Sequence, residues 1–299
     1  MKTVVITGSA RGLGFEMAKV FKRNNVNVVI SDLKEENLKK AKKMLDEIES
    51  ESKVSYAVCN VTNEEQVLEL IAHANKTFGK IDIWINNAGV NQPERAIWEL
   101  DTKDIDTVLS VDLKGAIIGS KYAMLDMSKN GEGAIYNIEG YGSNDAKMLG
   151  LSIYGTSKRA VTYFTEALAK ESAERNTGVI VGKLSPGIMI TDFITNALGN
   201  GEAINLSEKT KKVYNILGDY PDVVAKFLLI STSDKLSIVI FSIISYRHIP
   251  KAKGVSWFIK EKYIKELLWH KNIGFIVPFH NPLISPARPS LNTFIYRRI

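Results

Sequence analysis

Short apolar runs alternate with longer amphipathic stretches through the first 185 residues of this 299-residue chain, and this alternation limits the fold more than any other feature. The apolar runs are continuous, which is typical of strands buried on both faces of a sheet. The predicted strands cover residues 3–6, 26–30, 54–58, 81–85, 134–138 and 178–184, and the predicted helices cover 13–24, 34–50, 63–78 and 155–175. Such alternation forms a parallel sheet with helices on both sides. We therefore predict an α/β fold of three layers, built on a doubly wound parallel sheet.

A glycine-rich turn follows the first predicted strand directly. Glycines stand at positions 8, 12 and 14 of the run TGSARGLG, between a predicted strand and a predicted helix. Glycine permits the sharp bend and lets backbone amides approach a pyrophosphate at the helix N-terminus. Because the run lies in the first strand–helix–strand unit, it predicts a dinucleotide site of the Rossmann type. The candidate cofactor-binding residues here are Gly8, Ser9, Arg11, Gly12, Leu13 and Gly14.

Asp32 lies at the end of the second strand, near the position where an acidic residue meets the adenosine ribose in such sites. A carboxylate there accepts hydrogen bonds from the 2′- and 3′-hydroxyls and repels a 2′-phosphate, which favours NAD over NADP. Arg11 favours the opposite choice, because a guanidinium can pair with a 2′-phosphate. Repulsion between the Asp32 carboxylate and a 2′-phosphate costs more binding free energy than a flexible Arg11 guanidinium gains. The sequence therefore predicts NAD and leaves NADP open.

Tyr154 and Lys158 stand four residues apart at the start of the long predicted helix, so their side chains share one helical face. A tyrosine has an ordinary pKa near 10, which is too high for an easy phenolate at neutral pH. A neighbouring ammonium stabilises the phenolate. The pair therefore predicts general acid/base chemistry, in which Tyr154 transfers the proton and the Lys158 ammonium stabilises its phenolate.

Taken together, these motifs resemble the short-chain dehydrogenase/reductase family. The resemblance covers residues 1 to about 230 and follows the family's order: the glycine turn, Asp32, Asn86-Asn-Ala-Gly89, the Tyr154–Lys158 pair and Pro186-Gly187. It implies a single Rossmann-type domain that binds NAD(P) and interconverts an alcohol and a ketone by hydride transfer. A non-catalytic nucleotide-binding sensor is the alternative, against which the intact Tyr154 and Lys158 argue.

The resemblance implies further cofactor contacts. Lys158 would hydrogen-bond the nicotinamide ribose, and the Ile188 backbone and Thr191 would hold the carboxamide. Asn60 replaces the family's usual aspartate at the adenine amino group, and its oxygen can still accept that bond. The other implied cofactor-binding residues are Val61, Asn87, Ala88, Gly89, Tyr154, Pro186 and Gly187.

Two departures from the family's pattern concern catalysis. Asp112 stands where the family has an asparagine in a water relay, and we expect slower proton exchange because that relay mainly uses a backbone carbonyl. Where the usual pattern reads Asn-x-Ser-Ser, this chain has Asn137-Ile-Glu-Gly140, followed by Ser143.

The segment from Asn137 to Tyr154 is similar to the chlorophyll b reductase branch of the family, in which the serine lies nearer the tyrosine. This similarity implies Ser143 as the donor to the developing oxyanion, with a loop serine as the alternative. It does not extend to the substrate, because that branch has a basic residue after the second strand, where this chain has Asp32. Glu139 either tunes Tyr154, contacts a polar substrate or only occupies the loop.

Domain organisation follows from where the pattern stops. We expect a catalytic domain over residues 1–233, with a flap over the site at 189–215, and an irregular C-terminal extension over 234–299. The composition, 45% hydrophobic and 24% charged, is ordinary for a globular protein.

Composition and charge also limit the kinds of partner that the chain is expected to have. One cysteine, Cys59, allows no internal disulfide, and no signal segment precedes the first strand, so we expect a cytoplasmic protein. The net charge of +6 comes from scattered lysines, which disfavours nucleic acid, and no apolar stretch is long enough to span a bilayer. The four histidines share no ligand spacing, so no metal site is expected. The predicted partners are a small carbonyl or alcohol substrate and further copies of the chain, as a dimer or tetramer.

Overall fold

The computed structural model describes residues 1–187, 189, 220–222 and 224–225. All of them belong to the first of the two units into which the chain divides, Met1–His248. Several predictions fall outside these residues and stay predictions: the cofactor contacts of Ile188 and Thr191, the flap beyond residue 189, and the extension 234–299 with its boundary at residue 233.

Within the described part of the chain, six parallel strands form one sheet in the order β3-β2-β1-β4-β5-β6. The strands are β1 (Thr3–Ile6), β2 (Asn27–Asp32), β3 (Val54–Val58), β4 (Ile83–Asn86), β5 (Gly133–Ile138) and β6 (Val179–Leu184). The chain moves outward from β1 to β3, returns to β4 on the other side of β1, and continues to β6. This order confirms the predicted doubly wound Rossmann-type sheet.

Helices form the crossovers between the strands. They are α1 (Gly12–Arg23), α2 (Glu35–Asp46), α3 (Glu64–Phe78), α4 (Thr102–Val108), α5 (Gly115–Met127) and α6 (Ser152–Glu174), with a 3₁₀ turn η1 (Ile97–Glu99) and a π-helical segment η2 (Leu109–Lys114). Helix α2 ends earlier than the predicted residue 50, because the acidic residues at its carboxyl end oppose the helix dipole. The segment α4–η2–α5 has no predicted counterpart, since the sequence of α5, GAIIGSKYAMLDM, lacks an apolar stripe that would reveal a helix.

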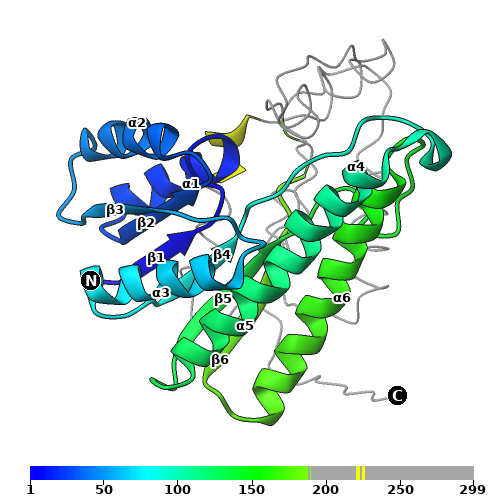
Figure 1. The fold of residues 1–299 in the computed structure, drawn as a ribbon. Helices are drawn as coiled ribbons and strands as arrows, with labels where there is room; N and C mark the ends of the chain where they lie inside the picture. The colour runs from blue at the N-terminus through cyan, green and yellow to red at the C-terminus, as the bar shows by residue number, and fades with distance from the viewer. Residues whose placement is uncertain (188, 190–219, 223, 226–299) are drawn as a thin grey trace, which may run out of the picture. The chain divides into compact units, whose positions relative to one another are not determined.

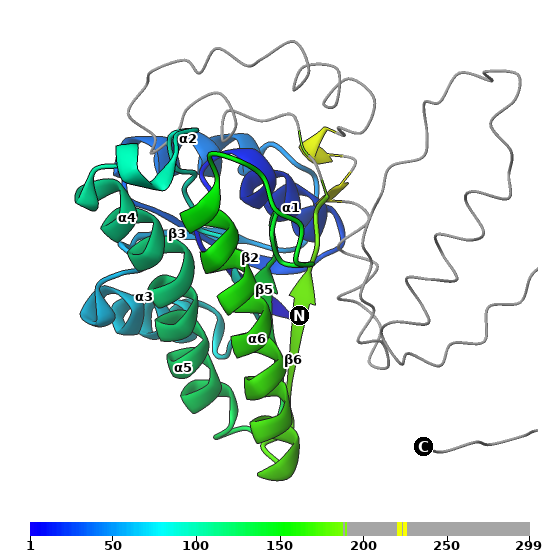
Figure 2. The same ribbon diagram turned by 90° about the vertical axis from the view of Figure 1, so that its right-hand side faces the viewer.

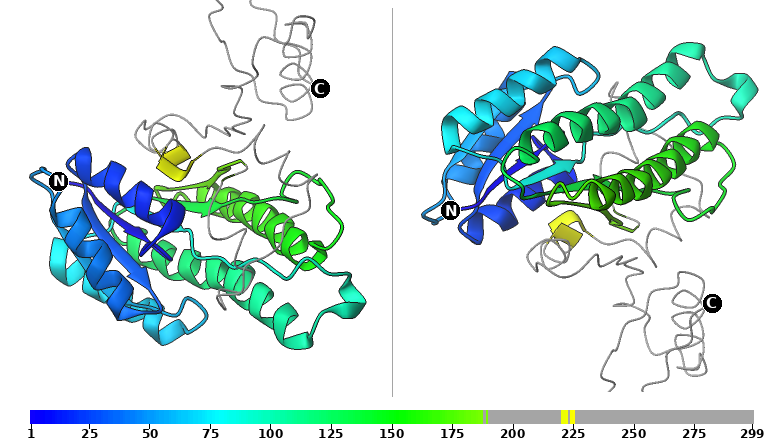
Figure 3. Two further views of the ribbon diagram at one scale, coloured as in Figure 1. Left: turned by 90° about the horizontal axis from the view of Figure 1, so that it is seen from above. Right: turned by 90° about the horizontal axis from the view of Figure 1, so that it is seen from below.

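The sheet is buried on both faces. Val4 and Ile6 of β1 pack with residues of α1 and α2, whereas Val5 between them packs with residues of α3 and α5. All three side chains are fully buried, as expected when alternate residues of a strand point to opposite faces. In Figures 1 and 2, α1 and α2 lie together on one side of the sheet, and α3, α5 and α6 cover the other. Figure 3 shows α5 and α6 side by side along their length.

The segments that carry the predicted site follow the carboxyl ends of four strands. The glycine turn follows β1, Asn86-Asn-Ala-Gly89 ends β4, residues 139–143 follow β5, and Pro186-Gly187 follows β6. In doubly wound sheets ligands bind outside this edge, where the strand order reverses, and here the reversal lies between β1 and β4. The topology therefore brings these four segments to one edge.

Candidate active site

The glycine turn has the geometry that backbone contact with phosphate requires. Gly8 and Gly12 have φ angles of +61° and +59°, in the left-handed region that glycine adopts without strain. A Cβ on Gly14 would lie 2.5 Å from Nδ2 of Asn87, so no larger residue fits there. The turn leads into the N-terminus of α1, where backbone N–H groups lack partners within the helix. These residues fit a pyrophosphate group.

Ser9, a predicted cofactor contact, is fully buried and uses its donors within the protein. Its hydroxyl donates to the carbonyl of Ile6 at 2.6 Å, and its N–H donates to the carbonyl of Ser31 at 2.9 Å. These two bonds fasten the turn to β1 and β2. Leu13 is buried in the core, and Arg11 is exposed at the start of α1.

The end of β4 is bound to both of its neighbours in the sheet. Nδ2 of Asn87 donates to the carbonyl of Thr7 at 2.8 Å, and the N–H of Asn87 donates to Oγ1 of Thr7 at 3.0 Å. Nδ2 of Asn86 donates to Oδ1 of Asn137 on β5 at 2.7 Å. These bonds fix Ala88–Gly89 beside the glycine turn.

The residues predicted for the adenosine half follow β2 and β3. The carboxylate of Asp32 accepts from the N–H of Leu33 at 2.8 Å, at the end of β2. The side-chain oxygen of Asn60 accepts from the N–H and the hydroxyl of Thr62, at 3.1 and 2.9 Å. Since a carbonyl oxygen has two lone pairs, the predicted bond from an adenine amino group would require Thr62 to give one of these up. Val61 is buried.

Tyr154 and Lys158 lie one turn apart near the amino end of α6. Both are buried, with 8% and 5% of their surface exposed. Nζ of Lys158 lies 5.6 Å from the centre of the Tyr154 ring and 3.5 Å from the carbonyl oxygen of Ile138. The structure therefore brings the predicted acid/base pair together, with an ammonium close enough to stabilise a phenolate.

Asp112, in η2, contacts the lysine of this pair directly. Its side chain is fully buried, and its Oδ2 lies 3.3 Å from Nζ of Lys158. Its Oδ1 accepts from the N–H of Val90 at 2.7 Å. Burial raises the pKa of the Asp112 carboxyl, while the Lys158 charge and the Val90 bond oppose that rise. The chain thus places an ionisable group beside Lys158 where the family has a neutral amide.

In the loop after β5, Gly140 lies in close contact with the phenol of Tyr154. A Cβ on Gly140 would lie 2.3 Å from the Tyr154 hydroxyl oxygen and 3.0 Å from Cγ of Lys158. A serine at this position, as in the usual family pattern, would collide with Tyr154. The space that a serine would fill is therefore taken by the phenol itself.

Ser143 lies in the same loop and is 7% exposed. Its hydroxyl accepts from the N–H of Gly140 at 3.2 Å and donates to the carbonyl of Lys158 at 3.3 Å. The second bond is long for a hydroxyl donor. Ser143 is thus near the acid/base pair, and it could donate to a substrate oxygen only by leaving the Lys158 carbonyl.

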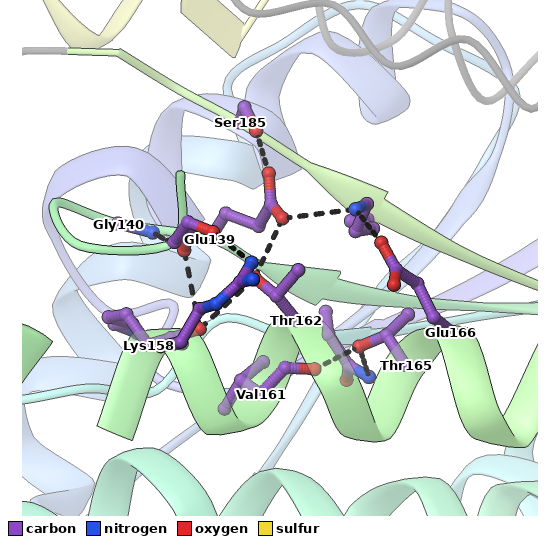
Figure 4. Close-up of polar contacts among 12 residues, drawn as sticks. Glu139, Gly140, Lys158, Val161, Thr162, Thr165, Glu166 and Ser185 are labelled. Atoms are coloured by element: carbon purple, nitrogen blue, oxygen red, sulfur yellow. Dashed lines mark hydrogen bonds and ion pairs between the residues drawn. The ribbon is translucent and has the colours of Figure 1, made fainter. Parts of the chain in front are cut away.

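Glu139 points toward the end of β6 and the middle of α6 (Figure 4). Its carboxylate accepts from the hydroxyl of Ser185 and from that of Thr162, the latter at 2.9 Å, and lies 3.5 Å from Nζ of Lys183. Lys183 also pairs with Glu166 at 2.6 Å. Of the roles that the sequence left open, these contacts favour a structural one, in which a buried carboxylate ties β5, β6 and α6 together.

The turn after β6 is anchored through the same carboxylate. Pro186 and Gly187 follow Ser185, and Gly187 has a φ of +75°, which suits a glycine. Because Ser185 donates to Glu139, this predicted nicotinamide-side turn is held to the loop that carries Gly140 and Ser143.

Gln92 is a site residue for which the sequence has no motif. Its Oε1 accepts from the N–H groups of Ile153 and Tyr154, both at 2.8 Å. Its side chain is buried, and its Nε2 donates to the carbonyl of Gly150 at 2.7 Å. The contact joins residues 62 positions apart in the chain, so no local pattern marks it.

Two further findings concern the described residues alone. No group of three or more His, Cys, Asp or Glu side chains among them is arranged to hold a metal ion. No helix in that part of the chain has the length and apolar character needed to cross a membrane.

Sequence comparisons agree with this geometry. The profile of the short chain dehydrogenase family matches residues 2–200. The chain is 32% identical over 244 residues to a probable chloroplastic chlorophyll(ide) b reductase of Oryza sativa subsp. japonica, covering 76% of this chain and 46% of the relative. It is also 32% identical over 229 residues to a chloroplastic chlorophyll(ide) b reductase of Arabidopsis thaliana, covering 76% of this chain and 64% of the relative. The chain thus spans about half to two thirds of the length of these relatives.

Solved structures share the fold. An NAD⁺-bound xylitol dehydrogenase matches with a TM-score of 0.68 at 22% identity, covering 78% of this chain and 92% of that one. An alcohol dehydrogenase of the archaeon Thermococcus sibiricus, complexed with 5-hydroxy-NADP, matches with a TM-score of 0.64 at 23% identity, covering 80% and 92%. With the glycine turn, the Tyr154–Lys158 pair and these relatives in agreement, the chain belongs to the short-chain dehydrogenase family of oxidoreductases, in a branch similar to the chlorophyll b reductases.

Proposed function

We propose that this chain is a nicotinamide-dependent oxidoreductase that interconverts an alcohol and a ketone, with Tyr154 as the acid/base. The observation that carries the proposal is the buried Tyr154–Lys158 pair, with the ammonium 5.6 Å from the ring, at the sheet edge that carries the glycine turn. Family membership supports an oxidoreductase, and the proposed reaction rests on the chemistry of this pair.

Proton transfer would run through Tyr154. In carbonyl reduction its phenol donates a proton to the substrate oxygen, and in alcohol oxidation its phenolate accepts one. The nicotinamide cofactor, when bound, donates or accepts the hydride. Lys158 stabilises the phenolate by its charge, and Ser143 would turn from the Lys158 carbonyl to donate to the developing oxyanion.

Asp112 would moderate this chemistry through Lys158. When ionised, its carboxylate offsets part of the ammonium charge, because the two groups lie 3.3 Å apart. This direct pairing takes the place of the family's asparagine relay and supports the expectation of slower proton exchange.

We propose NAD as the preferred cofactor. The glycine turn leads into the N-terminus of α1, where backbone N–H groups would bind the pyrophosphate, and Asp32 at the end of β2 would accept bonds from the ribose hydroxyls. The structural relatives were solved with NAD⁺ in one case and with a derivative of NADP in the other. The fold therefore admits both cofactors, and the Asp32 carboxylate is the reason to favour NAD.

The substrate we propose is a small carbonyl compound or the corresponding alcohol. The named activity of the plant relatives concerns chlorophyll(ide) b, but this chain covers only 46% and 64% of two of them. A homo-oligomer and a cytoplasmic location stay predictions, and both plant relatives are described as chloroplastic. The sensor alternative gains no support from these relatives, since their names describe reductases.

The experiment for this proposal combines binding and turnover. Purified full-length protein is titrated with NADH and with NADPH while nicotinamide fluorescence is followed, and a panel of ketones is then added to the complex. We expect tighter binding of NADH and a ketone-dependent loss of the NADH signal. Binding without loss of signal on any ketone would favour the sensor instead.

A further inference from the structure

The amino end of α6 carries Tyr154 but has no cap from its own segment. Leu151 occupies the N-cap position, and its side chain offers no acceptor. The first N–H groups of an α-helix have no partner within the helix, and a buried donor left unpaired is costly. Tyr154 is buried and Ile153 is partly buried, so an acceptor from elsewhere in the chain stabilises this helix end.

Gln92 supplies that acceptor from the loop after β4. Its Oε1 lies 2.8 Å from the backbone nitrogens of both Ile153 and Tyr154. Its Nε2 donates to the carbonyl of Gly150 at 2.7 Å, immediately before the helix. The residue is only 1% exposed, so water does not compete for these bonds. One carboxamide thus holds the start of α6 at the tyrosine itself.

The loop that carries Gln92 also makes a hydrogen bond to Asp112, the residue beside Lys158. The N–H of Val90 donates to Asp112 at 2.7 Å, and Asp112 lies 3.3 Å from Nζ of Lys158. The short segment Val90–Gln92 therefore reaches Tyr154 through the Gln92 side chain and Lys158 through Asp112.

The loop after β4 packs closely against the loop before α6, which allows Gln92 to contact the start of that helix. Gly150 has a φ of +82°, and a Cβ there would lie 2.8 Å from Cγ of Glu94 and 3.3 Å from the backbone nitrogen of Arg95. Only glycine lets the chain before α6 approach the segment just after Gln92 this closely.

We propose that Gln92 is a positioning residue, which caps α6 at Tyr154 and so fixes the phenol relative to the cofactor loop that ends in Gly89. The effect on turnover rests on the proposed function, since it assumes Tyr154 as the acid/base. A misplacement of about 1 Å at a reacting group can cost about 10²-fold in rate. The cap itself is a structural claim and can be tested without turnover.

The test compares two replacements of similar length. Gln92→Met removes the acceptor and the donor, whereas Gln92→Glu keeps an acceptor for Ile153 and Tyr154 but sets an oxygen against the Gly150 carbonyl and adds a buried charge. Asn63→Ala is the matched control, because Asn63 caps α3 by accepting from the N–H of Gln66 at 3.1 Å. Hydrogen–deuterium exchange over residues 150–158 reports on the cap, and kcat and the KM for NADH, measured with the most active ketone, report on positioning.

We expect Gln92→Met to speed exchange at the start of α6 and to lower kcat by about 10-fold or more, with the KM for NADH within about twofold. Gln92→Glu should keep more of the protection and of kcat than Gln92→Met does, because it retains the acceptor for both N–H groups, and Asn63→Ala should change neither. If the methionine variant does not fold, Gln92→Asn, whose shorter side chain cannot span the same bonds, takes its place.

Three outcomes overturn the proposal: unchanged exchange in Gln92→Met, equal defects in the methionine and glutamate variants, or a raised KM for NADH with kcat unchanged. If the unmodified protein turns over no ketone, the proposed function fails, and faster exchange in Gln92→Met alone still decides whether Gln92 is the cap.

Discussion

Alanine at position 140 tests whether the space beside Tyr154 matters for turnover. Gly140 does not have a positive φ, so an alanine there adds a methyl group without backbone strain. Its Cβ would lie 2.3 Å from the phenol oxygen, closer than the 3.0 Å below which real Cβ contacts are essentially never found. The phenol or the loop must therefore move by roughly 1 Å, and we expect kcat to fall by about 10²-fold. Overpacking of this kind also costs about 1–3 kcal/mol of stability.

The assay follows NADH consumption with the most active ketone, together with NADH binding by fluorescence. Binding should weaken much less than kcat, because the methyl group points at Tyr154 and Lys158 and not at the glycine turn that would hold the pyrophosphate. Gly155→Ala is the matched control: it adds the same methyl group next to Tyr154 on α6, with the nearest atom 3.9 Å away. Its kcat should stay within about twofold, since alanine is also the better helix former. Full activity of Gly140→Ala, or an equal loss in Gly155→Ala, would show that the position of the phenol beside residue 140 does not limit turnover.

Three other substitutions test single roles in the site. Ser143→Ala should lower kcat by about 10²-fold or more if its hydroxyl stabilises the oxyanion, and a loss of only a few-fold would assign that role to another donor. Asp32→Ala should narrow the ratio of NADH to NADPH affinity measured by fluorescence titration, and an unaltered ratio would remove Asp32 from the ribose. Asp112→Asn should move the midpoint of the pH–rate profile of alcohol oxidation to lower pH. The reason is that an ionised Asp112 carboxylate, 3.3 Å from Nζ of Lys158, offsets part of the charge that stabilises a phenolate, whereas a neutral amide does not. A shift to higher pH would contradict this account.

The sheet and the cofactor turn could be predicted from the sequence because their signals are local. Each buried parallel strand is a continuous apolar run, and the glycines of the first turn stand between a strand and a helix. The same holds for Tyr154 and Lys158, whose spacing within one helix places them on one face. For Ser9 the motif is present, but its buried hydroxyl bonds to Ile6 and Ser31 and not outward.

The parts of the site that could not be predicted depend on contacts between distant segments. Gln92 meets Tyr154 across 62 positions, and Asp112 meets Lys158 across two different helical segments. The collision that excludes a side chain from position 140 depends on where the Tyr154 phenol lies, and no spacing rule gives that position. Helix α5 has no predicted counterpart for another reason: its exposed face carries Ile117 and Leu125 while small residues fill much of its buried face, so no apolar stripe marks it.

A comparison of the unmodified protein with Tyr154→Phe decides whether the phenol of Tyr154 transfers the proton. NADH binding and single-turnover oxidation of bound NADH by a ketone are followed in the same samples by nicotinamide fluorescence. The account predicts that both proteins bind NADH with similar affinity and that only the unmodified protein oxidises it at a measurable rate. Turnover by Tyr154→Phe at an undiminished rate would contradict the account, because the proton would then come from a group other than Tyr154.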